Sequence, residues 1–78
     1  MKRYHILSSD DDTFLAEIEL KNGLAEMYNL YTSYGTSLFS EPEGETLYAE
    51  LLSWACFELG IDNEDACITD EDETEVLY

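Results

Sequence analysis

The sequence predicts an α+β fold, in which a small antiparallel sheet of three to four strands carries one helix packed on it. Three observations lead to this class. Residues 13–20 alternate apolar and acidic side chains, an Asn-Gly pair follows shortly after them, and residues 46–59 repeat apolar side chains at helical spacing. The 78 residues suffice for one small domain, and a hydrophobic share of 45% with an aromatic share of 13% indicates that this domain folds.

The first two predicted strands lie near the N-terminus. Residues 4–8 are mostly apolar and aromatic, and the Ser-Ser-Asp-Asp-Asp run over residues 8–12 ends them as a turn. In residues 13–20 the apolar side chains alternate with Glu17 and Glu19, which is the period-two pattern of a strand with one buried face.

A hairpin is predicted at Asn22-Gly23, because this pair tolerates the positive φ angles of a tight two-residue turn. Residues 24–34 are predicted as the returning strand. Three of their tyrosines, Tyr28, Tyr31 and Tyr34, also fit helical spacing and leave a helix as the alternative. Residues 35–40 are predicted as a loop.

One helix is predicted over residues 46–59, after a capping box in residues 40–43, Ser-Glu-Pro-Glu. Gly60 is suited to end this helix. Residues 67–68 and 76–78 are β-prone and complete an order of three strands, helix and strand. The apolar face of the helix combines a stripe of Leu47, Leu51, Trp54 and Ala55 with the flanking side chains Tyr48, Leu52, Cys56 and Leu59.

Negative charge is the most informative feature for function. The chain has 19 carboxylates, three Lys and Arg residues and a formal net charge of −16, and residues 22–78 contain no Lys or Arg. Such a surface repels nucleic acid and anionic membranes, and it attracts proteins that are built to hold phosphate. We therefore expect a basic, nucleic-acid-binding protein as the partner, with no direct binding of nucleic acid and no membrane contact.

The residues present do not favour catalysis. One His, two Cys and three basic side chains, without a glycine-rich phosphate loop, do not supply a nucleophile with its base and orienting group. His5 lies in an apolar segment, where a partly exposed or capped histidine is the simpler interpretation. A chain of this length leaves little room for a substrate cleft around two carboxylates. We expect neither an enzyme nor a cofactor.

Metal-binding patterns are not found either. Cys56 and Cys67 lack the paired spacing of zinc ligands, so we expect reduced core cysteines. A calcium-binding loop beginning at Asp62 would place Cys67 where a glycine is required, and one beginning at Asp10 would end on Lys21. Reduced cysteines, no secretory signal and no apolar stretch long enough to cross a membrane together predict a cytoplasmic protein.

The carboxylates are suited to imitate DNA phosphates. If the chain from Asp70 onward is extended, every second residue presents a carboxylate on one face, about 6.6 to 7 Å from the next. Such rows can enter a groove lined with Lys and Arg and displace its counterions, as nucleic acid does. The predicted partner-binding residues are Asp70, Glu71, Asp72, Glu73 and Glu75, then Asp10, Asp11 and Asp12, and Glu41, Glu43 and Glu45.

The same excess of acids is also compatible with simple solvation of a very small domain and with a halophilic origin. Halophilic surfaces favour Ala, Val and Asp, whereas this chain has one Val, six Tyr and eleven Leu residues. The composition therefore disfavours a halophilic origin and leaves solvation as the alternative to mimicry.

In size, charge and aromatic content the whole chain resembles the small acidic DNA-mimic inhibitors that phages deploy against host defence, the anti-CRISPR and anti-restriction proteins. The resemblance rests on composition, and no functional residue is carried over with it. It implies a protein encoded by a phage or mobile element that blocks the DNA-binding channel of a CRISPR effector or restriction enzyme in the host cytoplasm.

Two further functions are compatible with the same charge. An immunity or antitoxin protein would occupy the active site of one cognate nuclease with its tyrosines and carboxylates. A regulatory module would dock on a basic protein without competing for nucleic acid.

Holding a net charge of −16 in a compact domain raises its electrostatic free energy, and salt screens this repulsion. We expect the melting temperature to rise between low and moderate NaCl, as followed by circular dichroism. A melting temperature that stays flat over this range would contradict the expectation.

Overall fold

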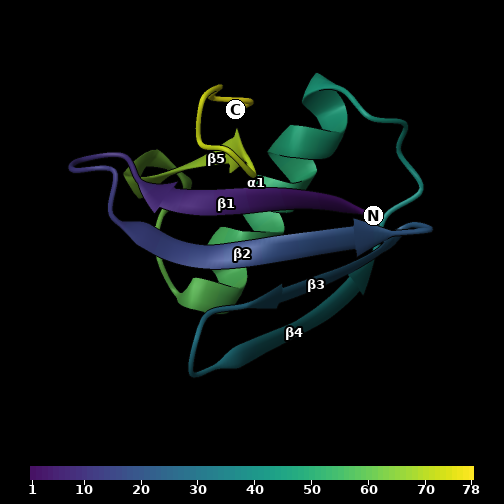
Figure 1. Cartoon of the computed structure of the whole chain (residues 1–78), viewed down its shortest axis with the longest axis horizontal. Helices are drawn as coiled ribbons and strands as arrows, with labels where there is room; N and C mark the ends of the chain where they lie inside the picture. The colour runs from purple at the N-terminus through teal and green to yellow at the C-terminus, as the bar shows by residue number, and fades with distance from the viewer.

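A computed structural model that describes residues 1–78 shows a five-stranded antiparallel sheet with one long helix on a single face (Figure 1). The α+β class is confirmed, with five strands where three to four were predicted. The elements are β1 (Lys2–Ser8), β2 (Phe14–Lys21), β3 (Leu24–Tyr28), β4 (Ser33–Leu38), α1 (Glu45–Leu59), the 3-10 helix η1 (Asn63–Asp65) and β5 (Ala66–Asp70). In spatial order the sheet runs β4-β3-β2-β1-β5, and α1 lies in the connection between the two edge strands β4 and β5.

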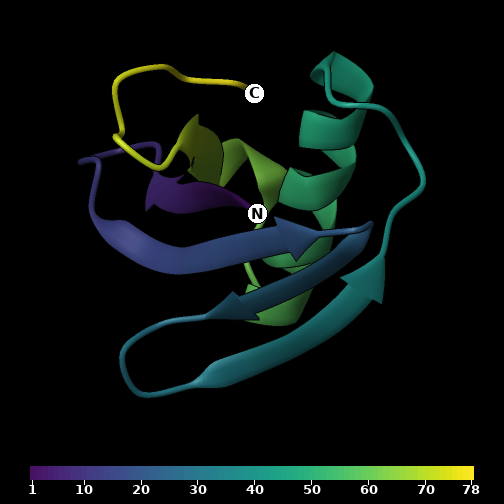
Figure 2. The same cartoon turned by 45° about the vertical axis from the view of Figure 1, so that its right-hand side comes forward.

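The apolar core lies between α1 and the sheet face that the helix covers (Figure 2). Since successive strand residues point to opposite faces, the alternation predicted for residues 13–20 buries one side of β2 and leaves the other side to form an open face. The buried cluster comprises Tyr4, Ile6, Ala16, Ile18, Ala25, Met27, Ala66 and Ile68 from the sheet and Leu47, Leu51, Leu52, Ala55 and Cys56 from the helix.

The Asn22-Gly23 hairpin is confirmed, with φ angles of 52° and 81° at these two residues. The segment that follows was predicted wrongly as one strand over residues 24–34 and a loop over residues 35–40. Instead β3 ends at Tyr28, and β4 begins at Ser33. Glycine and serine give β4 little local preference for a strand, and it forms because β3 offers a pairing partner.

The start of α1 also differs from the prediction. The helix begins at Glu45 after Gly44, and no side chain caps it, so the capping box does not form. Glu43 is used elsewhere, because its carboxylate accepts hydrogen bonds from Tyr4 and Tyr48 and lies 3.7 Å from Lys2 Nζ. Its carboxylate is therefore held by side chains of β1 and α1.

The end of α1 is as predicted. Gly60 has a φ of 72°, in the left-handed region that glycine adopts readily. The Ile61 N–H donates to Cys56 O at 3.0 Å and the Gly60 N–H donates to Phe57 O at 3.3 Å, which together form a Schellman motif.

Replacing Leu51 with Ala should lower the free energy of unfolding by about 2 to 5 kcal/mol, because Leu51 is fully buried and its loss leaves a cavity beneath the helix. The matched variant Phe57→Ala lies on the same helix, where Phe57 is 82% exposed, and should change it by less than about 0.5 kcal/mol. Urea unfolding measures both, and equal losses would contradict this placement of α1.

Candidate functional site

The few basic residues all lie toward one end of the sheet. Lys2 and Arg3 begin β1, and Lys21 ends β2, which runs antiparallel to β1 with Lys2 opposite Leu20. Arg3 contacts Glu19 at 3.5 Å and Glu71 at 3.9 Å. The carboxylates at the opposite end of β1 therefore have no Lys or Arg nearby to offset them.

Two loops meet at that opposite end. The Ser9 N–H donates to Asp65 O at 3.0 Å, and Ser9 Oγ donates to Glu64 O at 2.8 Å, so the β1–β2 turn is tied to the segment before β5. None of the carboxylates in these two loops forms an ion pair, and all are exposed. We call this group the turn-end cluster: Asp10, Asp11, Asp12, Asp62, Glu64 and Asp65.

The field of the turn-end cluster acts on the cysteines beneath it. Burial raises the pKa of Cys56, and the nearby charges of Asp65 and Asp62 raise it further. Burial and Asp12 raise the pKa of Cys67 in the same way. Both cysteines are unpaired, Cys56 buried and Cys67 half-buried, and their thiol forms are stabilised.

The predicted extended row from Asp70 is wrong. The strand β5 ends at Asp70, and the chain then turns back, with Glu73 at a φ of 58°. The side chain of Asp70 accepts hydrogen bonds from the Thr74 N–H and Thr74 Oγ1, both at 2.9 Å. These bonds lower the pKa of Asp70 and hold the turn. These carboxylates therefore lie around a turn and do not form an extended row. We call them the C-terminal cluster: Asp70, Glu71, Asp72, Glu73 and Glu75.

Predicted partner-binding residues from two separate segments do lie together, at the end of the sheet where β1 begins. A hollow of about 380 Å³ has Glu43 on its wall together with four members of the C-terminal cluster, Asp70, Glu71, Asp72 and Glu75. Lys2 and Arg3 line the same hollow and partly neutralise it. Glu41 lines an adjoining hollow of about 460 Å³, and Glu45 is the first residue of α1. Asp10 to Asp12 are not part of this group, because the length of β5, about 15 Å, lies between the two clusters.

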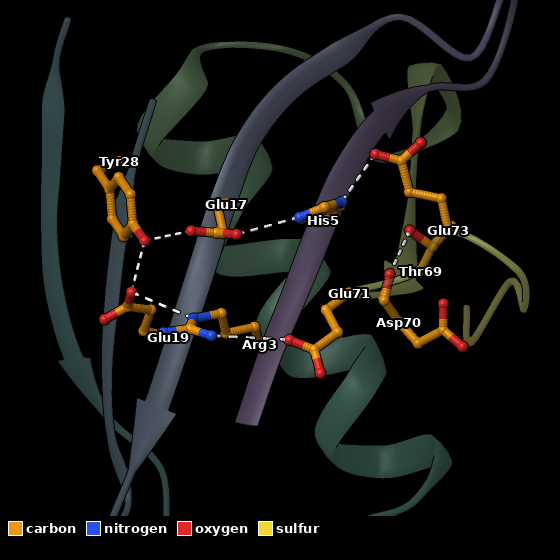
Figure 3. A network of polar contacts seen from close by, with 9 residues as sticks. All are labelled: Arg3, His5, Glu17, Glu19, Tyr28, Thr69, Asp70, Glu71 and Glu73. Carbon is orange, nitrogen blue, oxygen red and sulfur yellow. Dashed lines mark hydrogen bonds and ion pairs between the residues drawn. The ribbon is translucent and has the colours of Figure 1, made fainter. Parts of the chain in front are cut away.

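A polar network that the sequence did not predict crosses the open face of the sheet (Figure 3). His5 on β1 lies between two carboxylates, with Nε2 at 3.1 Å from Glu17 and Nδ1 at 2.8 Å from Glu73. It is partly exposed, as predicted. His5 therefore joins β1 to Glu17 of β2 and to Glu73 in the turn after β5.

Tyr28 joins the same network from β3. Its hydroxyl lies between Glu17, with which it forms a short hydrogen bond, and Glu19 Oε1 at 2.5 Å. The hydrogen bonds to these two carboxylates and their charge strongly raise the pKa of Tyr28. Burial would raise the pKa of Glu17, but the hydrogen bonds from Tyr28 and His5 outweigh it and the pKa is lowered.

The residues missed by sequence reasoning are Asp62, Glu64 and Asp65 of the turn-end cluster and Glu17, Glu19 and Tyr28 of the network. The alternation in residues 13–20 already placed Glu17 and Glu19 on one face, and that signal predicted an acidic open face without showing what lies opposite. Nothing local predicted that residues 62–65 lie beside Ser9.

No group of three or more His, Cys, Asp and Glu side chains converges as a metal site would require. No helix here has the length and apolar character needed to cross a bilayer. Comparison with protein-family models, with curated proteins and with solved structures finds no match to this chain. The function is therefore inferred from the geometry of the chain itself.

Removing the Tyr28 hydroxyl should weaken the pH dependence of stability. The folded pKa of Glu17 lies below its ordinary value of 4.5, so its contribution is present above that pH and is lost as the pH falls through the folded pKa. In Tyr28→Phe the contribution of Glu17 to the free energy of unfolding becomes smaller. The difference in unfolding free energy between wild type and variant should therefore be largest near neutral pH and should disappear at acidic pH.

Urea unfolding across a pH series measures this gap. The control is Tyr31→Phe, since Tyr31 is 94% exposed and its hydroxyl forms no hydrogen bond within the protein. A gap that is constant with pH would contradict the role of Tyr28.

Proposed function

We propose that this protein is a non-catalytic inhibitor that binds the basic nucleic-acid-binding surface of a host defence protein, a CRISPR effector or a restriction enzyme. Its carboxylates would occupy the Lys and Arg side chains that otherwise hold DNA phosphates. The observation that supports this proposal best is the turn-end cluster, where six exposed carboxylates on two joined loops have no basic partner.

The turn-end cluster is the stronger contact for energetic reasons. Like charges held close together repel one another, and a cationic surface removes this cost as it binds. Because these carboxylates are exposed and form no ion pairs, binding does not first break an ion pair within the protein. Among their side chains, that of Asp11 accepts one hydrogen bond, from the Thr13 N–H at 3.1 Å. Two joined loops also hold the charges at fixed positions, which lowers the entropy lost on binding.

The C-terminal cluster and Glu43 form a weaker contact. Lys2 and Arg3 already neutralise part of their charge, and Asp70 is occupied by Thr74. The clusters at the two ends of β5 would contact separate parts of a long basic channel. An immunity protein, in contrast, needs only one compact site for one nuclease.

The direct test captures binding partners on the immobilised full chain, elutes them with a salt gradient and repeats the capture with added duplex DNA. We expect a nucleic-acid-binding protein that elutes at moderate salt and is released by DNA of unrelated sequence. A partner that ignores DNA would support a docking module, and a single nuclease that ignores unrelated DNA would support an immunity protein.

Neutralising the turn-end cluster should weaken binding more than neutralising the C-terminal cluster. We compare Asp10→Asn, Asp11→Asn and Asp12→Asn together with the charge-matched control Glu71→Gln, Asp72→Asn and Glu75→Gln. The first set should make the dependence of log affinity on log salt less steep, and the second set should change it less, because salt screens the charge pairs that each set removes. Equal losses from both sets would contradict the ranking of the two clusters.

A further inference from the structure

Another segment of the chain covers one edge of the sheet, at β5, and leaves the other edge, at β4, uncovered (Figures 1 and 2). Along β5 the C-terminal segment covers the edge, since the Leu77 N–H donates to Ile68 O at 2.8 Å and the Asp70 N–H donates to Glu75 O at 3.2 Å. A bridge between Thr69 and Val76 continues this cover. Along β4 no other segment pairs with the outer side. The sheet therefore has one open edge.

The open edge has no charged residue, which is unusual in this chain. Charged residues make up 28% of the sequence, yet none occurs in residues 27–40, which hold the end of β3, the connecting turn and all of β4. Natural proteins commonly protect an exposed edge strand with charges or proline. Here the segment instead exposes apolar side chains, with Leu30, Tyr31 and Leu38 at 87%, 94% and 78%.

The backbone groups that face outward on β4 can be assigned. The Phe39 N–H donates to Gly23 O at 2.7 Å, so position 39 faces β3. In an antiparallel ladder the facing alternates, and Gly35 and Ser37 therefore also turn toward β3. Thr36 and Leu38 turn their N–H and C=O groups to solvent, where a further strand would find them.

Unpaired carboxylates flank this edge on both faces of the sheet. On the open face, Glu26 lies opposite Thr36 on one side and Glu19 on the other, and no base contacts it. On the helix side, Glu58 Oε2 lies 3.7 Å from the position that a Cβ of Gly35 would take. Two carboxylates thus stand beside neighbouring positions of β4, one on each face.

The position of Glu58 discriminates between occupants of the edge. If a second copy paired its β4 here, two chains of charge −16 would meet, each with a Glu58 carboxylate beside Gly35 of its edge strand. A strand with adjacent basic residues instead places a cation beside Glu58, and a long Lys or Arg side chain on its other face can extend past Thr36 toward Glu26 on β3. It also relieves the direct opposition of Glu19 and Glu26, since like charges opposite one another destabilise a sheet.

We propose that β4 is a strand-addition site for an extended, basic segment of the target protein, which pairs with the outward groups of Thr36 and Leu38, places Lys or Arg beside Glu58 and directs a second basic side chain across β4 toward Glu26. The basic character of the partner rests on the proposed function. The strand pairing supplies backbone hydrogen bonds that the acidic clusters do not. The protein would hold its target both by charge and by an added strand.

The test uses a synthetic nine-residue peptide of alternating valine and threonine with a central Lys-Arg pair. One matched peptide carries a Glu-Glu pair in place of the Lys-Arg pair. The other carries N-methyl groups on every second residue, so that the edge that would pair with β4 has no N–H groups to donate. Each is titrated into the isotope-labelled full chain and followed by amide chemical shifts. The first peptide should shift the amides of residues 33–38 and slow hydrogen exchange at Thr36 and Leu38, while neither matched peptide does so.

Variants separate the edge from the total charge. Thr36→Lys places a cation at the edge and should weaken peptide binding at least about tenfold, because like charges across an interface are strongly unfavourable. Ser53→Lys makes the same change in net charge on the exposed side of α1 and should leave binding within about twofold. Glu58→Gln should weaken binding more than Glu50→Gln, a second exposed site on α1.

Several results would overturn this inference. They are no shift at millimolar peptide, shifts confined to the acidic clusters, equal binding of the N-methylated peptide, or a concentration-dependent dimer that Thr36→Lys abolishes. None of these requires the defence protein. If the peptide does not bind but partners are still captured and released by DNA, only the edge site is refuted. If the peptide binds but no captured partner is released by DNA, the proposed function is refuted and the edge site stands.

Discussion

The apolar contact between α1 and one face of the sheet holds this protein together against the repulsion of its own charges. Every strand except β4 contributes side chains to the buried cluster, and no Asp, Glu, Lys or Arg side chain is among the buried residues. Because no carboxylate has to enter the core, the chain can carry a net charge of −16 on its surface. The cost is long-range repulsion, which a cationic partner or salt reduces.

This division of the molecule decides where a partner can act. Lys2, Arg3 and Lys21 all lie toward one end of the sheet, so the carboxylates differ in how far a nearby base neutralises their charge, although they are alike in sequence. Those near Lys2 and Arg3 are partly neutralised, those of the network are engaged with His5 and Tyr28, and those of the turn-end cluster form no ion pair. The uncharged edge of β4 is a third kind of surface, suited to backbone pairing.

The candidate site was predictable only in part. Asp10 to Asp12 were recognised because a run of acids after an apolar strand is a local signal for an exposed turn. The three acids before β5 join them through backbone contacts between Ser9 and residues 64–65, which no local pattern encodes. The extended row from Asp70 was wrong because its carboxylate binds Thr74 and bends the chain.

The sequence by itself determined the α+β class, the hairpin at Asn22-Gly23 and the end of α1 at Gly60. Each depends on periodicity or on backbone angles within a few residues, and such preferences act before distant segments meet. Tertiary structure alone decided that residues 33–38 form an edge strand and that the helix begins without a capping box. Strand pairing supplies the hydrogen bonds that weak propensity does not, and a carboxylate near a helix start goes to whichever donors the folded chain brings to it.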